Sequence, residues 1–460
     1  MDFLGINVLL ENIPSLDKGF IPLSKFNMEF LKTAKSPLAI AIERDNALIS
    51  VYETYIHGTD TMYAADCYYI ERLVKTLLWT RGGYRVYVCG DEKIGEFIKG
   101  IYDTTGKRAF DNKFMARVYE KDFEIICLNY DKRPAANELS KSIGGHLEGC
   151  RIGFDAGGSD RKVSAVIDGK VIYSEEVVWF PKINEDPDYH FDEIVKAFQS
   201  AAERLPRVDA IGISSAGIYI NNLTRVASLF LKVPEELFNE KVKDIYLRAA
   251  KVIGDIPVEV ANDGDITALA GAMELNDTNV LGIAMGTSEA AGYIDDEGNI
   301  TGWLNELAFV PVDCQTEALM DEWSGDIGCG VKYFSQDAVI KLATVAGITF
   351  VENLSPADKL KEVQKLLEDN QPAAIKIYES IGCYLGHSLS LYSDIYNFKH
   401  ILLLGRVMSG EGGNIIVRVA KQVLRSEYPT LCDKIKVHLP DEDNRRVGQS
   451  IAAASLPTVN

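Results

Sequence analysis

The pattern of apolar and polar residues predicts an α/β protein from the first residues onward. In the first 149 residues it predicts strands at 38–42, 48–55 and 84–89 and helices at 67–79 and 92–102. Residues 113–118 and 123–128 are expected to pair as a β-hairpin about Lys121 and Asp122. This order of elements predicts an α/β module at the N-terminus.

A three-stranded meander is predicted to begin just after residue 150. The elements expected here are strands at 151–156, 163–167, 170–178 and 208–214 and a helix at 191–205. Three strands followed by a helix and a further strand are typical of the ribonuclease-H-like fold. The later elements repeat this alternation, with strands at 257–260, 280–284, 290–294 and 400–404 and helices at 266–273, 373–392 and 446–455.

Residues 132–149 are the best linker candidate in the chain. They contain one proline and three glycines, Pro134, Gly144, Gly145 and Gly149, which are typical of connecting segments. A new domain is therefore predicted to begin near Cys150. We expect residues 1–149, of unknown role, to dock on the rest of the protein or to mediate a homodimer.

Composition narrows the possible partners and the compartment. The 460 residues carry a net charge of −19, and the Lys and Arg residues form no basic run, so nucleic acid would be repelled by most of the surface. The eight cysteines show no disulfide-type or CxxC spacing, which favours reduced thiols in the cytoplasm. No run of 18 apolar residues is present, so membrane spanning is not expected.

A turn with two glycines follows the strand that ends at Asp155. Gly157, Gly158 and Ser159 could close on a phosphate with main-chain N–H groups and a hydroxyl, because glycine can adopt backbone angles closed to other residues. Asp155 would then face the accompanying metal. The alternative is ordinary turn chemistry.

Asn262 and Asp263 form a second polar site, between a short strand and an Ala-rich helix. Open α/β sheets place their ligands at this position, at the carboxyl ends of the strands. The alternative is that one of these two side chains only caps the helix.

Two further glycine-containing turns follow in the second half of the chain. Gly286 and Thr287 lie in a turn between two strands, about 130 residues after the first hairpin. Two such hairpins facing each other could grip one polyphosphate. Gly405, Ser409 and Gly410 follow the strand 400–404 and lead into a helix, where they could pack against an adenine ring and its phosphates.

The order of these motifs resembles the ROK family of sugar kinases and repressors, within the superfamily of acetate and sugar kinases, heat-shock chaperones and actin. The motifs are DAGGS at 155, GISSAG at 212, ANDGDITALA at 261, AMGTSEAAGYI at 284 and LLLGRVMSGEGG at 402. The resemblance implies two ribonuclease-H-like lobes of the actin-like ATPase type with a cleft between them. The first lobe would be 150–262, with the C-terminal helix 443–460 packing back on it, and the second 263–442.

The resemblance also implies roles for the motif residues. Asp263 would be the catalytic base, Asn262 and Glu306 would bind the sugar, and Asp155 would orient Mg²⁺ through water. The residues expected to bind ATP are Asp155, Gly157, Gly158 and Ser159 at the terminal phosphates, Gly286 and Thr287 in the second phosphate loop, and Gly405, Ser409 and Gly410 at the adenosine.

Several positions depart from the family pattern. Phe309 stands where the family has a histidine that binds sugar and a structural zinc, and Val331 replaces a sugar-contacting glutamate. Only Cys329 remains of four zinc ligands, so zinc is not expected, since a structural site takes four ligands. The loop 322–335 should then be held by packing of its aromatic residues, Trp323, Tyr333 and Phe334.

The function expected from the resemblance is ATP-dependent phosphorylation of a hexose or N-acetylhexosamine hydroxyl. The lost histidine and glutamate favour an alternative, a non-catalytic sensor of sugar or nucleotide on the same fold. A DNA-binding repressor is the least supported hypothesis, because the chain is acidic and residues 1–149 show no helix-turn-helix pattern.

Overall fold

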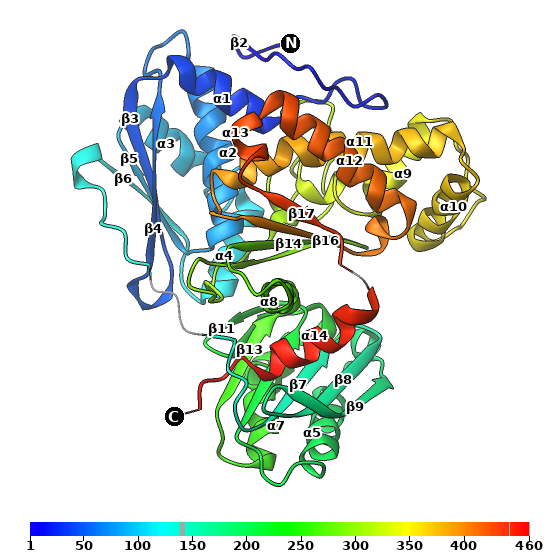
Figure 1. Cartoon of the computed structure of the whole chain (residues 1–460). Coiled ribbons are helices and arrows are strands. Elements are labelled where there is room, and N and C mark those ends of the chain that lie inside the picture. The colour runs from blue at the N-terminus through cyan, green and yellow to red at the C-terminus, as the bar shows by residue number, and fades with distance from the viewer. Residues whose placement is uncertain (139–142, 441, 460) are drawn as a thin grey trace.

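The computed structural model describes residues 1–138, 143–440 and 442–459. Three mixed sheets of four or five strands organise the described chain, and each belongs to a different stretch of sequence (Figure 1). The first stretch contains β1 (Asp2–Phe3), β2 (Ile6–Asn7), α1 (Leu23–Thr33), β3 (Ser36–Glu43), β4 (Ile49–Ile56), α2 (Tyr63–Arg81), β5 (Arg85–Cys89), α3 (Glu92–Ile101), α4 (Ala109–Tyr119) and β6 (Glu124–Leu128). Its sheet has the order β4-β3-β5-β6.

The hairpin predicted from 113–118 and 123–128 is wrong. Residues 109–119 form the helix α4, and β6 pairs in parallel with β5. Met115, Val118 and Tyr119 lie buried on one side of α4, a helical spacing of three to four residues. Residues 113–118 alone are compatible with the period of a helix or with that of a strand, and only the packing of the whole helix decides between the two.

The second sheet has the order β13-β10-β7-β8-β9. Its region comprises β7 (Cys150–Ala156), β8 (Asp160–Ile167), β9 (Lys170–Val178), α5 (Pro187–Ala202), β10 (Ala210–Ser215), β11 (Ile218–Ile220), β12 (Leu223–Val226), α6 (Glu235–Leu237), α7 (Ile245–Ile253) and β13 (Val258–Asn262). The predicted meander is present as the antiparallel strands β7, β8 and β9. β10 runs parallel to both β7 and β13, so three strands end at the same edge.

The third sheet has the order β15-β14-β16-β17. This region comprises α8 (Asp263–Leu275), β14 (Val280–Met285), β15 (Glu289–Ile294), α9 (Gln336–Val345), α10 (Pro356–Glu368), α11 (Pro372–Ser393), β16 (His400–Leu404), α12 (Glu411–Glu427), α13 (Pro429–Cys432), β17 (Lys436–His438) and α14 (Glu442–Ala454). The fold is therefore α/β, as the residue pattern predicts.

The C-terminal helix α14 lies on the second sheet, beside α8 (Figure 1). Two strand glycines permit this contact. A Cβ at Gly153 would lie 2.3 Å from the carbonyl oxygen of Ser450, and one at Gly212 would lie 1.7 Å from that of Ala453. Ile152 and Phe154 point to the opposite face, where they pack with α5 and α7, because strand residues alternate between faces.

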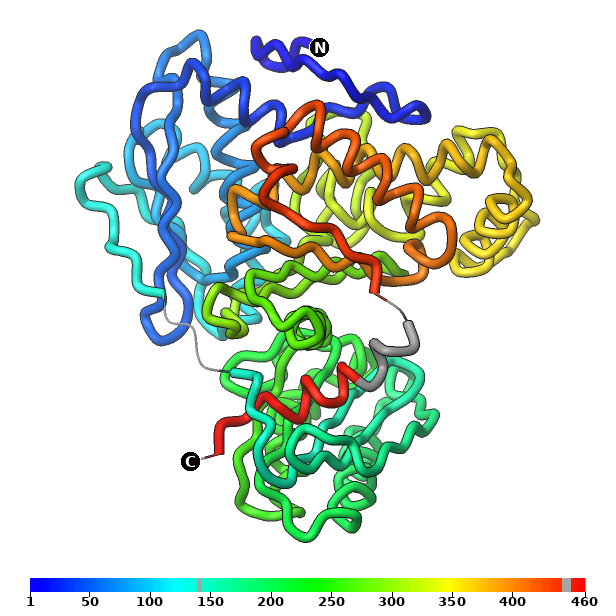
Figure 2. The backbone as a smooth tube through the Cα atoms, in the orientation of Figure 1, coloured from blue at the N-terminus to red at the C-terminus, as the bar shows by residue number. Residues whose placement is uncertain are grey.

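The N-terminal stretch docks on the region of the third sheet. One hydrophobic cluster includes Phe26 of α1, Trp79 of α2 and Ile377 and Ile416 of α11 and α12. The tube in Figure 2 shows the first residues running beside these C-terminal helices, and Glu427 accepts hydrogen bonds from the amides of Glu11 and Asn12. The predicted boundaries at 149/150 and 262/263 remain predictions.

None of the helices in the described residues is long and apolar enough to cross a lipid bilayer.

Candidate functional site

The candidate site begins at the shared edge of the strands β7, β10 and β13. Ser214 of β10 is paired with Asp155 of β7, and Ser215 is paired with Asn262 of β13. The hydroxyl of Ser214 donates a hydrogen bond of 2.8 Å to Asp155. Parallel pairing thus brings Asp155 and Asn262 to one edge, although 107 positions separate them in the printed sequence.

The predicted phosphate hairpin connects β7 and β8. Neither Gly157 nor Gly158 has φ between +20° and +160°, so the expectation of unusual backbone angles is wrong. Close approach requires glycine at one of the two positions: a Cβ at Gly157 would lie 2.6 Å from the carbonyl oxygen of Asp160, whereas one at Gly158 would meet only the flexible end of Lys182, 2.7 Å from Nζ. Ser159 donates its hydroxyl hydrogen bond to Asp160.

Asn262 is the N-cap of α8. Its Oδ1 accepts from the amide of Gly264 at 2.7 Å, and its Nδ2 donates to the carbonyl of Gly217 at 2.7 Å. The capping alternative therefore describes this side chain, and a contact with sugar remains a prediction. Asp263 is the first residue of the helix, and its Oδ1 also accepts from the amide of Gly264, at 3.0 Å.

Four carboxyl groups, which we call the acidic cluster, gather around the start of α8: Asp155, Asp263, Asp265 and Glu306. Burial, followed by the charge of Asp155, raises the pKa of Asp263 to about 6. Burial also raises the pKa of Asp265 to about 7, against the hydrogen bond from Asn305. Burial and the charges of Asp263 and Asp265 raise the pKa of Glu306 to about 7.

No cation offsets these shifts at α8 and Glu306. Among the described residues, Asp263, Asp265 and Glu306 form no ion pair, and the charges that act on their pKa values, after burial, are all like charges. For Asp155, burial raises the pKa although the Ser214 hydrogen bond and the charge of Lys162 act in the opposite direction. Carboxyl groups with raised pKa values are typical of sites that transfer protons or bind cations.

The segment that carries Glu306 is tied directly to α8. Asn305 donates from Nδ2 to Asp265 at 2.9 Å and accepts from the hydroxyl of Tyr396 at 3.1 Å. The amide of Tyr293 also donates to Asp265, at 3.3 Å. These contacts place Glu306 beside the two aspartates of the helix.

The other two predicted turns adjoin each other. A Cβ at Gly405 would lie 2.4 Å from the carbonyl oxygen of Met285, and Gly405 has φ +94°, so this position requires glycine. Gly286 therefore lies next to the turn that leads through Ser409 and Gly410 into α12. Thr287 is exposed. The loops predicted to hold phosphate and adenosine in the third region meet at one end of its sheet.

A cavity of 150 Å³ opens beside Asn262 and Asp265. Its lining comes from all three regions and includes Arg44, Tyr119, Gly217, Asn262, Asp265 and Trp303. Trp303 stacks with Tyr293, with 5.5 Å between ring centroids, and the guanidinium of Arg81 lies 3.2 Å from the centre of its ring. The N-terminal stretch thus forms part of the wall of the candidate site.

The residue pattern does not single out Lys182 and Glu289. Lys182 follows β9 in a single helical turn and lies against Gly158, where its ammonium could contact a phosphate. Glu289 begins β15 and is buried, and burial raises its pKa well above the ordinary value. A lone lysine after a strand and a glutamate after two hydroxyl residues carry no sequence pattern that would identify them.

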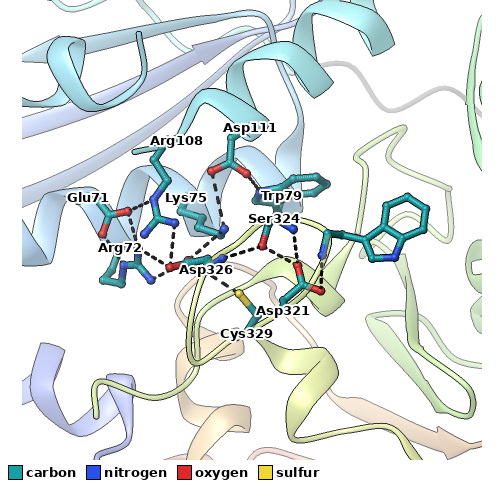
Figure 3. A network of polar contacts seen from close by, with 11 residues as sticks. Glu71, Arg72, Lys75, Trp79, Arg108, Asp111, Asp321, Ser324, Asp326 and Cys329 are labelled. Atoms are coloured by element: carbon teal, nitrogen blue, oxygen red, sulfur yellow. Dashed lines mark hydrogen bonds and ion pairs between the residues drawn. The ribbon is translucent and has the colours of Figure 1, made fainter. Parts of the chain in front are cut away.

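A second polar cluster, which we call the ion network, occupies the region of the degenerate zinc motif (Figure 3). It contains three cations and three anions: Arg72, Lys75, Arg108, Glu71, Asp111 and Asp326. Asp326 lies 2.9 Å from Arg72, 3.0 Å from Lys75 and 2.8 Å from Arg108. Cys329 points toward it, with Sγ 3.8 Å from Oδ2 of Asp326.

The ion network corrects the prediction about the loop 322–335. Tyr333 and Phe334 are buried as expected, but Trp323 is 64% exposed and does not hold the loop. Asp326 does so through its ion pairs with the N-terminal stretch. Within residues 1–138, 143–440 and 442–459, no group of three or more His, Cys, Asp or Glu side chains is arranged to hold a metal ion.

Comparison with known proteins identifies the type of domain. The sequence pattern of the ROK family matches residues 151–453, and no curated protein matches the chain in sequence. A hexokinase of the ROK family from Thermus thermophilus is 18% identical with a TM-score of 0.50, over 66% of this chain and 97% of that one. A glucokinase from Parabacteroides distasonis is 18% identical with a TM-score of 0.51, over 67% and 98%.

A transcriptional regulator is similar to the same extent. This ROK protein, a homologue of the Escherichia coli MLC protein, is 20% identical with a TM-score of 0.51, over 67% of this chain and 79% of that one. At these identities the similarity shows the fold, which enzymes and regulators share.

Proposed function

The chain belongs to the ROK family, and on that premise we propose that it transfers the terminal phosphate of ATP to a hydroxyl of a hexose or an N-acetylhexosamine. The observation that carries the proposal is the state of Asp263. It lies at the start of α8 with no cation beside it among the described residues, and its pKa is about 6. A general base works best when its pKa lies near the working pH.

Phosphoryl transfer requires positioning and charge stabilisation rather than covalent help from the protein. Asp263 would accept the proton of the attacking hydroxyl. The hairpin 157–159 and Gly286 with Thr287 would contact the phosphates, and the turn from Gly405 through Ser409 to Gly410 would contact the adenosine. Lys182, which lies against Gly158, would add a positive charge at the phosphate end.

Magnesium fits the chemistry of this site. Carboxylate oxygens and water are the ligands that Mg²⁺ prefers. Asp155 presents such a carboxylate beside Asp263, and burial raises the pKa of Asp155. We propose that Asp155 holds Mg²⁺ through water and that the ion neutralises charge on the phosphates.

The acceptor would lie between Asn262, Glu306 and the cavity next to Asp265. Glu306 is partly buried and has no cation partner among the described residues, so a sugar hydroxyl would satisfy it by donating a hydrogen bond. Trp303 also lies in the cavity wall, where its ring packs against Tyr293 and Arg81.

A coupled assay of ADP release over a panel of hexoses and N-acetylhexosamines tests the proposal. Turnover with at least one sugar, dependent on Mg²⁺, is the expected result. Binding of nucleotide or sugar without turnover on any member of the panel would favour the second candidate, a non-catalytic sensor. The observation behind that candidate is Asn262, whose amide oxygen and nitrogen are both engaged within the protein.

Regulators share the fold, so binding to DNA needs its own test. With a net charge of −19, we expect no retention on heparin or on duplex DNA at physiological salt. Tight retention that weakens as salt rises would overturn this part of the proposal.

A further inference from the structure

The C-terminal end of α2 accepts hydrogen bonds from the segment that carries Glu306. The amide of Glu306 donates to the carbonyl of Trp79 at 2.9 Å, and the amide of Asn305 donates to the carbonyl of Thr80 at 3.0 Å. The last carbonyls of a helix have no partner within the helix. In this protein, residues more than 220 positions along the chain supply those partners.

The side chain of Trp79 holds the other end of the same segment. Its ring stacks on Phe309 with 4.0 Å between ring centroids and an angle of 25° between the planes. Its Nε1 donates to Asp111 of α4 at 3.0 Å, and the residue is fully buried. Trp79 therefore contacts the segment 305–309 through its main chain at one end and through its ring at the other.

The ion network fixes the position of α2 itself. Arg72 and Lys75 are three residues apart on this helix, so they project from the same face, and both meet Asp326. Arg108 approaches Asp326 from outside α2 (Figure 3). All of these side chains are buried, and separating one partner of a buried ion pair is strongly unfavourable. The helix therefore cannot shift without breaking the network.

The conformation of Asn305 leaves the segment little freedom. Asn305 has φ +53°, in the left-handed region that asparagine tolerates better than most residues. Its side chain is held between Asp265 and Tyr396. Since both its main chain and its side chain are fixed, the direction in which Glu306 leaves the turn is fixed as well.

We propose that α2 is the positioning element of the acceptor site: Trp79 and Thr80 hold the turn at Asn305, and the ring contact between Trp79 and Phe309 sets the position of Glu306. This inference rests on the proposed function. It assigns a role to the stretch before residue 151, which the family pattern does not cover. Trp79 and Phe309 are positioning residues, because they act on the acceptor through Glu306.

The test uses the full chain with Phe309→Ala, which removes the ring contact without burying a charge. Phe309→Tyr keeps the ring and serves as the rescue. Phe350→Ala is the matched control, because Phe350 is also half-buried but lies outside the contacts of α2. The two measurements are hydrogen exchange of a peptide containing Asn305 and Glu306, and the KM values for sugar and for ATP.

We expect Phe309→Ala to speed exchange of this peptide by about tenfold, because local opening becomes easier. The KM for sugar should rise by about tenfold while the KM for ATP stays within about twofold, as expected when ground-state acceptor binding is lost. Phe309→Tyr and Phe350→Ala should resemble the wild type. Unchanged exchange in Phe309→Ala, or equal effects on both KM values, would overturn the inference.

The two proposals can fail separately. Faster exchange in Phe309→Ala together with no turnover by the wild type would remove the kinase and leave the positioning role standing. If Phe309→Ala does not fold, Phe309→Leu replaces it, since this variant keeps an apolar side chain and loses the ring that stacks on Trp79. Exchange as slow as in the wild type would then count against the inference.

Discussion

The ion network is a buried group of charged side chains and the acidic cluster is a partly buried one, and the two differ in whether cations neutralise their carboxylates. The ion network balances three cations against three anions, and although burial acts to raise the pKa of Asp326, Arg72 and Lys75 hold it below the ordinary value. In the acidic cluster, Asp263, Asp265 and Glu306 have only like-charged neighbours, and their pKa values are raised.

Within the ion network, the distance from a carboxylate to its cations determines whether its pKa is lowered or raised. Asp326 has three cations within 3.0 Å, whereas Asp111 has Lys75 at 3.7 Å. Burial accordingly raises the pKa of Asp111 despite Lys75 and the bond from Trp79. A buried carboxylate is stabilised only when cations and donors are close enough to replace its lost hydration. The network therefore joins chain segments that are distant in the sequence, while under the proposed function the charge of the acidic cluster would meet a ligand.

The largest effect is expected from Asp263→Asn, which keeps the shape of the side chain and removes the proposed base. Loss of a general base typically costs about 10² to 10⁴ in kcat, roughly 3 to 5 kcal/mol of barrier. The melting temperature should not fall, because Asn262 is the N-cap of α8 and the raised pKa of Asp263 means that its charge does not stabilise the folded state. Steady-state kinetics and thermal unfolding measure both quantities. Full activity of the variant would reject Asp263 and make Asp265 the next candidate.

Asp326→Asn should produce a loss of stability instead of a loss of chemistry. It leaves three buried cations without their shared partner, and breaking a buried pair costs about 3 to 5 kcal/mol. Denaturant unfolding measures the change. The control is Lys93→Ala, since the pair of Lys93 with Asp60 is exposed at 74% and 97% of the two side chains. A similar, small effect from both variants would show that the network does not hold the fold.

Asp265→Asn should stabilise the protein, and only at high pH. The folded pKa of Asp265 is about 7 against an ordinary value of 3.8, so the folded state binds more protons than the unfolded state between these values. The stability that Asp265 contributes by holding its proton in the folded state is complete below about pH 4 and is lost as pH rises through about 7. At pH 8 the free energy of unfolding of the variant should therefore exceed that of the wild type by about 2 kcal/mol, which is part of the pKa shift converted to free energy. At pH 4 the two proteins should be almost equally stable.

Unfolding at the two pH values measures this gain. Asp277→Asn is the control of opposite sign, because the hydrogen bond from His400 and that from the amide of Thr278 lower the pKa of Asp277 to about 2. Its stabilising contribution is present above the ordinary pKa and lost as pH falls toward 2. Equal effects of Asp265→Asn at pH 4 and pH 8 would contradict the reasoning about burial.

The smallest expected effect is the pH dependence of the wild type. Asp263 acts as a base only when ionised, so kcat/KM should fall as pH drops below about 6, by about tenfold at one pH unit below that value. Initial rates measured between pH 5 and about 8 show this fall in kcat/KM. The residual activity of Asp263→Asn should not fall in this way at low pH. A fall that persists in this variant would assign the ionisation to another group, such as Glu306.

The sequence by itself determined the local features of this protein. A glycine turn after an apolar strand, a polar pair ahead of a helix and the order of the five motifs are written in neighbouring residues. They suffice to predict the α/β class, the meander of β7, β8 and β9, and Asp155, Asn262 and Asp263 as residues at strand ends. These features depend on backbone preferences and on the period of burial, which act over a few residues.

Only the tertiary structure decided what holds the site in place. The ion pairs of Asp326 and the support of Glu306 by Trp79 join residues more than 200 positions apart. The exposure of Trp323 likewise follows from how the loop lies on the folded protein. No local pattern predicts which cation a buried carboxylate will meet, because its energy depends on neighbours brought in by folding. The same holds for the raised pKa values of Asp263, Asp265 and Glu306, which arise from burial and mutual proximity.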